Sequence, residues 1–142
     1  DITDEIRTPE VTKMASTVSA YPAVREFLFD LQQKLAKEHN VIMDGRDIGT
    51  VVLPDADLKI FLTASPEERA SRRYLEWKDK PDCPTYEKIL ADIIERDYQD
   101  THRSIAPLKK ADDAIVVDTT SIGFHEVCEE ITDLIESRLE DE

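Results

Sequence analysis

The sequence predicts an α/β fold in which helices flank a parallel β-sheet. Three short apolar runs, Val41–Met43, Leu58–Ala64 and Ala114–Asp118, are rich in β-branched or aromatic residues and nearly unbroken by polar positions. This pattern is typical of strands that are covered on both faces of a parallel sheet. Helical patterns lie between and around the three runs, and strands that alternate with helices predict right-handed βαβ units.

Two helices are predicted before the first strand. Thr8–Ala20 has a helical pattern, and Pro22–Lys37 repeats apolar side chains at spacings of three and four residues. The members of this repeat are Val24, Phe27, Leu28, Leu31 and Leu35. Such a stripe indicates an amphipathic helix that buries one face.

Three more helices are predicted after the second and third strands. Ser65 is followed by a proline and two acids, the pattern of an N-cap and first turn, and this helix should extend to about Trp77. The segment Asp79–Thr85 contains two prolines and is predicted to be a loop. The other two helices are predicted at 86–102 and 124–138, each with one apolar face.

The bulk composition limits the class of protein. A chain of 142 residues with 40% hydrophobic residues has the size of one domain and can build a core. No apolar run approaches the roughly 20 residues that cross a membrane, and no secretion leader is expected. Cys83 and Cys128 lie far apart, without metal-type spacing. We therefore expect a soluble, cytoplasmic protein without a membrane partner.

The charge pattern points to a small ligand. A formal net charge of −14 repels nucleic-acid phosphates, which argues against a general DNA- or RNA-binding protein. The arginines nevertheless gather in short clusters around positions 69–73 and 96–103. We expect an acidic protein that concentrates its arginines in this way to use them locally, on a small anion.

The first candidate cluster is Asp44-Gly45-Arg46-Asp47, directly after the first predicted strand. Ligands of open α/β sheets bind outside the carboxyl ends of the strands. Arg46 and Asp47 would offer one donor fork and one acceptor there, which suits a ligand with an anionic and a polar part. The alternative is an ordinary surface ion pair in a tight turn.

The second cluster follows the second predicted strand. Arg69 and Arg73 are four residues apart, so they share one helix face and could bind the same polyphosphate. The alternative is a solvated face on which these arginines and Arg72 pair with neighbouring acids of the same helix. Those acids are Glu67, Glu68 and Glu76.

The third cluster lies on the helix predicted at 86–102. Arg96, Asp100 and Arg103 are spaced by four and three, so they line one face. Two arginines beside one acid could bind a phosphate or a sugar; the alternative is a salt-bridge ladder worth about 0.3–0.5 kcal/mol per pair. The histidines are predicted to be structural or surface residues, and no metal site is predicted. These histidines are His39, His102 and His125.

Taken in order, these segments resemble the bacterial cytidylate kinase family. The resemblance begins with I-R-T-P-E-V, Ser16 and Arg25, and continues through D-G-R-D-I-G-T-V-V and S-x-E-E-R-A-x-R-R. It ends with E-R-D-x-x-D-x-x-R-x-x-A-P-L and A-x-x-V-D-T-T, and it extends over essentially the whole chain. It implies a three-layer parallel sheet with flanking helices, similar to the P-loop nucleoside monophosphate kinases.

The sequence departs from this family at its N-terminal strand. Family members begin with a strand and a glycine-rich phosphate loop, but no G-x-x-x-x-G-K-[ST] is present here. The resemblance therefore implies one domain that is incomplete at that strand, which would lie between the strands ending at Asp44 and Ala64. Its segments would be a nucleotide-binding insert and following helix at 1–40, core strands and the start of a lid at 41–75, the lid and next helix at 76–103, and the last core strand and C-terminal helix at 104–142.

The resemblance also implies a role for each matching residue. Catalytic positioning of the acceptor and transferred phosphates would fall to Arg46, Arg96 and Arg103. Binding of the nucleoside monophosphate would fall to Ser16, Arg25, Asp47, Arg96 and Asp100. Contacts with ATP around the lid would fall to Arg69 and Arg73.

The implied reaction is transfer of the γ-phosphoryl group of ATP, supplied with Mg²⁺, to CMP or dCMP. Because the phosphate loop is missing, we expect this chain alone to have little or no kinase activity. Two alternatives stay open: a non-catalytic kinase remnant that acts as a binding or self-associating module, and a related kinase for UMP or AMP. A whole family member is expected to be monomeric, whereas unpaired strand edges would favour self-association of this chain.

Overall fold

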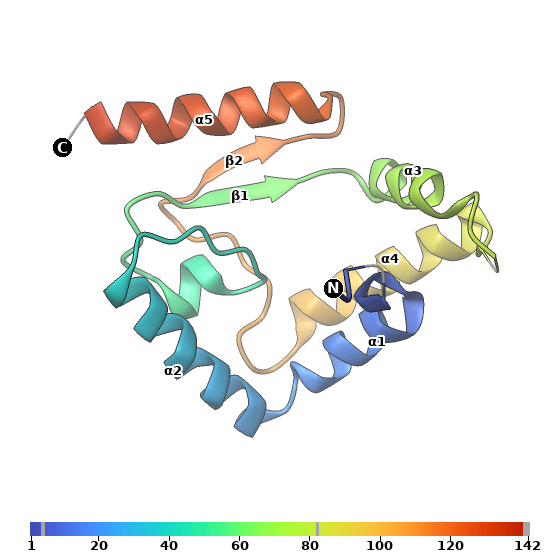
Figure 1. Cartoon of the computed structure of the whole chain (residues 1–142), viewed down its shortest axis with the longest axis horizontal. Helices are drawn as coiled ribbons and strands as arrows, with labels where there is room; N and C mark the ends of the chain where they lie inside the picture. The colour runs from blue at the N-terminus through green and yellow to red at the C-terminus, as the bar shows by residue number, and fades with distance from the viewer. Residues whose placement is uncertain (4, 82, 141–142) are drawn as a thin grey trace. The chain divides into compact units, whose positions relative to one another are not determined.

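The computed structural model describes residues 1–3, 5–81 and 83–140, apart from the side chains of residues 7, 9 and 16. The contacts divide the chain into two compact units, Asp1–Gly45 and Arg46–Glu142. Each unit is described by itself, with the helices and strands labelled as in Figure 1.

The first unit is helical. It contains a short 3₁₀-helix, η1 (Glu5–Arg7), followed by α1 (Pro9–Val18) and α2 (Pro22–Glu38). The Thr8 side chain caps α1 by accepting the Val11 amide at 3.3 Å. Both helices begin with a proline, which fits the first helical turn because its amide needs no partner there. The two predicted helices are confirmed to within two residues at each end.

The strand predicted at Val41–Met43 is wrong. Residues 40–44 form neither helix nor strand, and Ile42 is 93% exposed. A strand needs a neighbour with which to exchange main-chain hydrogen bonds, and no described segment pairs with this one. Asp44 and the three residues after it therefore do not follow a strand, contrary to the prediction.

In its described residues, the second unit contains a two-stranded sheet, one turn of π-helix and three α-helices. Its elements are η2 (Ile48–Val52), β1 (Ile60–Thr63), α3 (Pro66–Trp77), α4 (Tyr86–His102), β2 (Ile115–Asp118) and α5 (Phe124–Glu140). The side chains of Ser65 and Thr85 cap α3 and α4, accepting the amides of Glu68 at 3.1 Å and Lys88 at 3.3 Å. All three helices predicted here are confirmed. In the part of the chain that is described, no helix is long and apolar enough to cross a membrane.

Strands β1 and β2 run side by side in the same direction (Figure 1), with Ile60 paired to Ile115 and Thr63 to Asp118. A parallel pair needs a long crossover, which α3 and α4 supply. The predicted parallel pairing is confirmed. The expected burial of both faces is wrong: Val117 is buried, but Leu62 is 56% and Val116 50% exposed. Two strands and α5, which buries no residue, leave much of this short sheet uncovered among the described residues.

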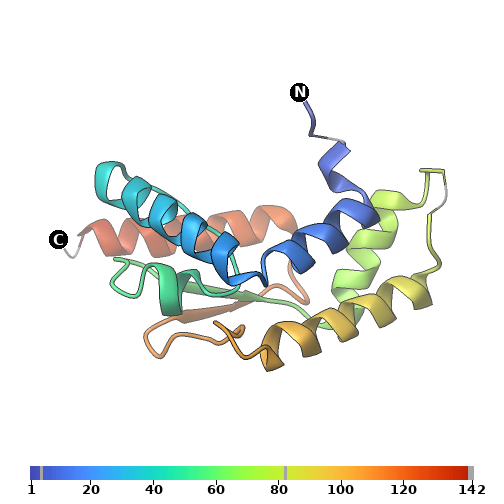
Figure 2. The ribbon, with the colours of Figure 1, turned by 90° about the horizontal axis from the view of Figure 1, so that it is seen from below.

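The apolar core of the second unit lies between α3 and α4, which pack together as a helical pair (Figure 2). Ala70 and Trp77 on α3 are buried against Ile89 on α4. Tyr74 and Tyr86 add an edge-to-face ring contact with centroids 6.5 Å apart. This packing fixes the face of α4 that carries the candidate site.

Candidate functional site

An acidic side chain on α4 lies at the centre of the candidate site. Asp100 is 7% exposed, and carboxylates are rarely buried without a partner. Its Oδ2 accepts a hydrogen bond from Arg46 Nε at 2.8 Å, and it lies 3.8 Å from Arg96 Nε. The fold thus brings Arg46, from the segment before η2, onto the face of α4 that the sequence predicts.

A turn of π-helix holds the second acid. Asp47 is buried, and its main-chain carbonyl accepts the amides of Val51 at 2.9 Å and Val52 at 3.2 Å. Turns of π-helix are rare in proteins, and those that occur often lie at functional sites. The Asp47 carboxylate lies 3.8 Å from Nη2 of Arg103, which follows the end of α4. This ion pair joins two residues that the sequence places in separate clusters.

Two guanidinium nitrogens of this cluster, Arg96 Nε and Arg103 Nη2, are buried without a hydrogen-bond partner among the described residues. A buried donor without an acceptor costs free energy, so each nitrogen favours an acceptor from a ligand. Burial lowers the pKa of Arg96, and the neighbouring charge of Arg46 lowers it further. A cation destabilised in this way gains from a nearby anion.

The cluster carries an excess of positive charge. Three arginines face two aspartates, and the charge of Arg73 on α3 also contributes to the lowered pKa of Arg96. The guanidinium of Arg73 lies 5.0 Å from the centre of the Trp77 ring and forms no ion pair among the described residues. Because guanidinium groups bind phosphate through paired N–H donors, the arrangement fits a phosphate-bearing ligand.

Arg69 has a different environment from Arg73, although both lie on α3. Its Nε donates to the Ala64 carbonyl at 3.1 Å, and its Nη1 donates to Asp97 Oδ1 at 2.9 Å. A second bond, from Nη2 to Asp97, completes a two-point contact with α4. Hydrogen bonding by Asp97 raises the pKa of Arg69. In this structure Arg69 therefore braces α3 against α4.

Two predicted substrate-binding residues belong to the first unit. Ser16 lies on α1, and its side chain is outside the described part of the structure. Arg25 lies on α2, is partly buried, and donates from Nη1 to the Ser19 carbonyl at 3.5 Å. The roles of both residues stay predictions.

A polar network at the carboxyl ends of the strands was not singled out from the sequence. Arg72 donates to Thr119 Oγ1 at 3.0 Å, and this buried hydroxyl donates to the Thr63 carbonyl at 3.1 Å. Arg72 also donates to Glu68 at 2.8 Å, so the predicted pairing within this helix is found for Arg72. The signal available in the sequence was the pair of threonines after an apolar strand, where parallel sheets place their polar groups.

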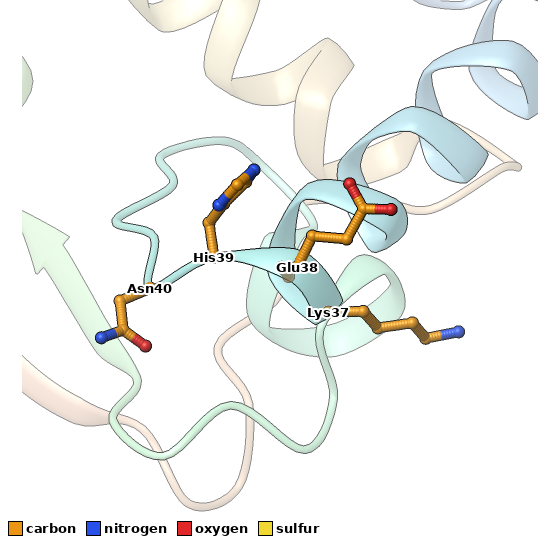
Figure 3. A pocket seen from close by; sticks show the side chains of 5 residues that line it. Lys37, Glu38, His39 and Asn40 are labelled. Carbon is orange, nitrogen blue, oxygen red and sulfur yellow. The ribbon is translucent and has the colours of Figure 1, made fainter.

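A surface pocket at the end of α2 contains none of the predicted residues. It is lined by residues 36–40, and the side chains of Lys37, Glu38, His39 and Asn40 point in different directions (Figure 3). They therefore do not converge on a ligand. Across residues 1–3, 5–81 and 83–140, no group of three or more acidic, histidine or cysteine side chains could hold a metal ion.

Comparison with known proteins gives a consistent result. The family model described as cytidylate kinase matches residues 1–137. A cytidylate kinase of Lactobacillus johnsonii is 51% identical over 138 residues, which are 97% of this chain and 60% of the relative. Those of Caldicellulosiruptor bescii and Streptococcus sanguinis are 54% and 57% identical, over 94% and 89% of this chain and 59% and 56% of their own lengths. The chain thus spans about 60% of the length of these curated relatives.

Proposed function

The chain belongs to the cytidylate kinase family, and on this premise we propose that it carries the acceptor side of a phosphoryl-transfer site. The complete enzyme would transfer the γ-phosphoryl group of ATP to CMP or dCMP. The observation that supports this most directly is the cluster around Asp100, with its excess arginine charge and two buried donors that have no acceptor among the described residues. We also propose a cytoplasmic location for the enzyme.

In this proposal, Arg46, Arg96 and Arg103 hold the acceptor phosphate and offset charge as the phosphoryl group moves. Phosphoryl transfer depends almost entirely on such positioning and electrostatic stabilisation. The buried Arg96 Nε and Arg103 Nη2 are the atoms best suited to the phosphate oxygens, because neither has a hydrogen-bond acceptor in the described part of the chain.

The two buried aspartates would act on the nucleoside. Asp100 and Asp47 would accept hydrogen bonds from the cytosine or the sugar. The family resemblance also assigns binding of the nucleoside monophosphate to Ser16 and Arg25, and these two roles stay proposals. The hydrogen bond from Arg46 Nε fixes the orientation of the Asp100 carboxylate, which supports a role as an acceptor.

ATP with Mg²⁺ would supply the phosphoryl group. The guanidinium groups of Arg73 and Arg69 fit its anionic phosphates, and Arg73 is the better placed because it has no ion pair among the described residues. Arg69 would have to exchange Asp97 for a phosphate. Closure of a lid at about residues 76–86 would exclude water from the reaction.

We propose that the 142-residue chain by itself has little or no kinase activity, because its sequence contains no phosphate-loop motif. A coupled assay of ADP release should show no CMP-dependent turnover above background. Turnover close to that of a complete cytidylate kinase would contradict this proposal.

Binding of CMP tests the acceptor site itself. Isothermal titration of the chain should show tighter binding of CMP than of AMP, and Arg96→Ala should weaken CMP binding by about tenfold or more, as expected for a hydrogen bond to a charged group. Lys88→Ala is the matched control on the same helix, because Lys88 pairs only with the exposed Asp92 in α4 among the ion pairs described. Equal affinity for CMP and AMP would contradict the assignment of a cytidine nucleotide as the ligand.

A second candidate function is a non-catalytic module that self-associates. The exposed apolar side chains of the short sheet favour it, since Leu62 and Val116 are half or more exposed. Sedimentation velocity distinguishes the two candidates: a stable monomer that binds CMP supports the kinase assignment, whereas a CMP-independent oligomer supports the module.

A further inference from the structure

One residue beside the site has an unusual backbone conformation. Ala106 has a φ of 45° and is the one non-glycine residue with positive φ among the described residues. Side chains other than glycine rarely adopt this left-handed region, because the Cβ crowds the following carbonyl. Pro107 follows directly and disfavours helical conformations in the residue before it. Such strain persists only where the surrounding contacts enforce it.

Two hydrogen bonds enforce it here. The Ala106 carbonyl accepts from Arg103 Nε at 2.6 Å, and the Leu108 amide donates to the Asp100 carbonyl at 2.7 Å. The loop 103–108 is thereby folded back onto the last turn of α4. It joins the main chain of one site residue, Asp100, to the side chain of another, Arg103.

The bond to Ala106 determines which atoms of Arg103 remain available. With Nε committed to the Ala106 carbonyl, the guanidinium is held so that Nη2 lies 3.8 Å from Asp47 Oδ1, buried and without a hydrogen-bond partner among the described residues. A long arginine side chain would otherwise sample many rotamers, and fixing it in advance lowers the entropic cost of binding a ligand.

We propose that Ala106 is a positioning residue. Its left-handed backbone directs its carbonyl onto Arg103 Nε and thereby aims Arg103 Nη2 at the phosphate of the acceptor nucleotide. This inference rests on the proposed function, because it takes Arg103 as a phosphate ligand.

The first experiment tests the positioning without any ligand. In Ala106→Val the β-branched side chain strongly disfavours the left-handed region, so the carbonyl should turn away from Arg103. Nitrogen-edited NMR of the arginine side chains should show the Arg103 Nε–H signal, slow to exchange in the original chain, becoming fast to exchange in this variant. Ala106→Gly, which adopts positive φ without strain, should keep the slow signal.

The matched control is Ser104→Val, which places the same side chain in the same loop at a residue without positive φ. It should leave the Arg103 signal unchanged. Thermal unfolding followed by circular dichroism identifies variants that fail to fold. An unchanged Arg103 signal in Ala106→Val, or the same loss in Ser104→Val, would overturn the proposal.

The second experiment measures CMP binding by titration in a double-mutant cycle. Ala106→Val should weaken CMP binding about tenfold in the original chain and should have no further effect when Arg103 is already alanine, since the two residues act through one contact. Equal weakening in both backgrounds would indicate a merely structural role and overturn the proposal. Failure of the original chain to prefer CMP over AMP would instead count against the proposed function, and the ligand-free Arg103 signal would still decide the role of Ala106.

Discussion

Under the proposed function, Asp100 would contribute both to the stability of the fold and to ligand binding. Its carboxylate is buried, and the closest of its contacts is the 2.8 Å hydrogen bond from Arg46. Burial lowers the pKa of Arg96, and the nearby charge of Arg46 lowers it further, so without Asp100 these two positive charges would repel one another with no acid between them. If the cluster binds an anionic substrate as proposed, Asp100 would keep these cations together before the substrate arrives.

Replacement of Asp100 by asparagine should show this coupling. We expect Asp100→Asn to lower the free energy of unfolding by about 1.5–3 kcal/mol, the range for hydrogen bonds to charged groups. The control is Asp92→Asn on the same helix, whose exposed pair with Lys88 should contribute only about 0.3–0.5 kcal/mol. Urea unfolding measures both values, and equal losses in the two variants would contradict the assigned role of Asp100.

A second aspartate, Asp118, should make the stability of the fold depend on pH. The Thr120 hydroxyl, at 2.6 Å, and the Thr120 amide both donate to Asp118 Oδ1, and together they lower the pKa of Asp118 below its ordinary value of 3.8. A carboxylate whose pKa is lower in the folded state stabilises the fold above its unfolded pKa, and this contribution is lost as the pH falls through the folded pKa.

The difference in melting temperature between the original chain and Asp118→Asn should therefore be largest at neutral pH and should shrink below about pH 4, near the ordinary aspartate pKa. Asp112→Asn is the control, because Asp112 is exposed and forms no ion pair among the described residues. Melting curves from pH 7 to pH 3 provide the measurement. A difference in melting temperature that stays constant over this range would show that the charge of Asp118 does not contribute to stability.

Among the helices, the pair α3–α4 determines where the site residues lie. Its short core of Ala70, Trp77 and Ile89 holds the two helices together, and the bond from Arg69 to Asp97 joins them at the surface. Since α4 carries Arg96 and Asp100, loosening this pair should disturb the site as well as the fold.

Trp77 tests the contribution of this pair. Trp77→Ala should lower the free energy of unfolding by about 3–5 kcal/mol, the range for truncating a buried aromatic residue. Leu75→Ala on the same helix should change it by less than about 0.5 kcal/mol, because Leu75 is exposed. Chemical unfolding of the two variants provides the comparison, and a small loss in Trp77→Ala would mean that the helices are held together by other contacts.

The elements that the sequence predicted correctly are those with local signals. Helices α3 and α4 begin where Ser65 and Thr85 supply caps, and the spacing of Arg96 and Asp100 follows from the period of one helix. The contact of Arg46 with Asp100 joins residues 54 positions apart and has no local signal. Likewise, the apolar run at 41–43 reads as a strand from its composition, but pairing depends on a neighbour that no local pattern specifies.

Over the whole chain, two properties oppose each other in solution. The formal net charge of −14 makes copies of the chain repel one another, whereas the exposed apolar side chains of β1 and β2 favour association. A two-stranded sheet also presents main-chain groups along its edges that can pair with another chain. Raising the salt concentration screens the repulsion and leaves the apolar attraction, so the balance can be shifted in a controlled way.

We therefore expect the chain to self-associate more strongly at 0.5 M than at 0.05 M salt, and Val116→Lys to reduce this association because lysine on an exposed strand opposes edge pairing. Leu139→Lys is the matched control: it adds the same positive charge at another exposed apolar residue, but on α5 rather than in the sheet. Sedimentation velocity at both salt concentrations gives the fraction of oligomer. If the two variants reduced association equally, the contact would depend on charge and not on the sheet. If the original chain stayed monomeric at high salt, the exposed strands would be insufficient to bring copies together, and the self-associating module would lose its support.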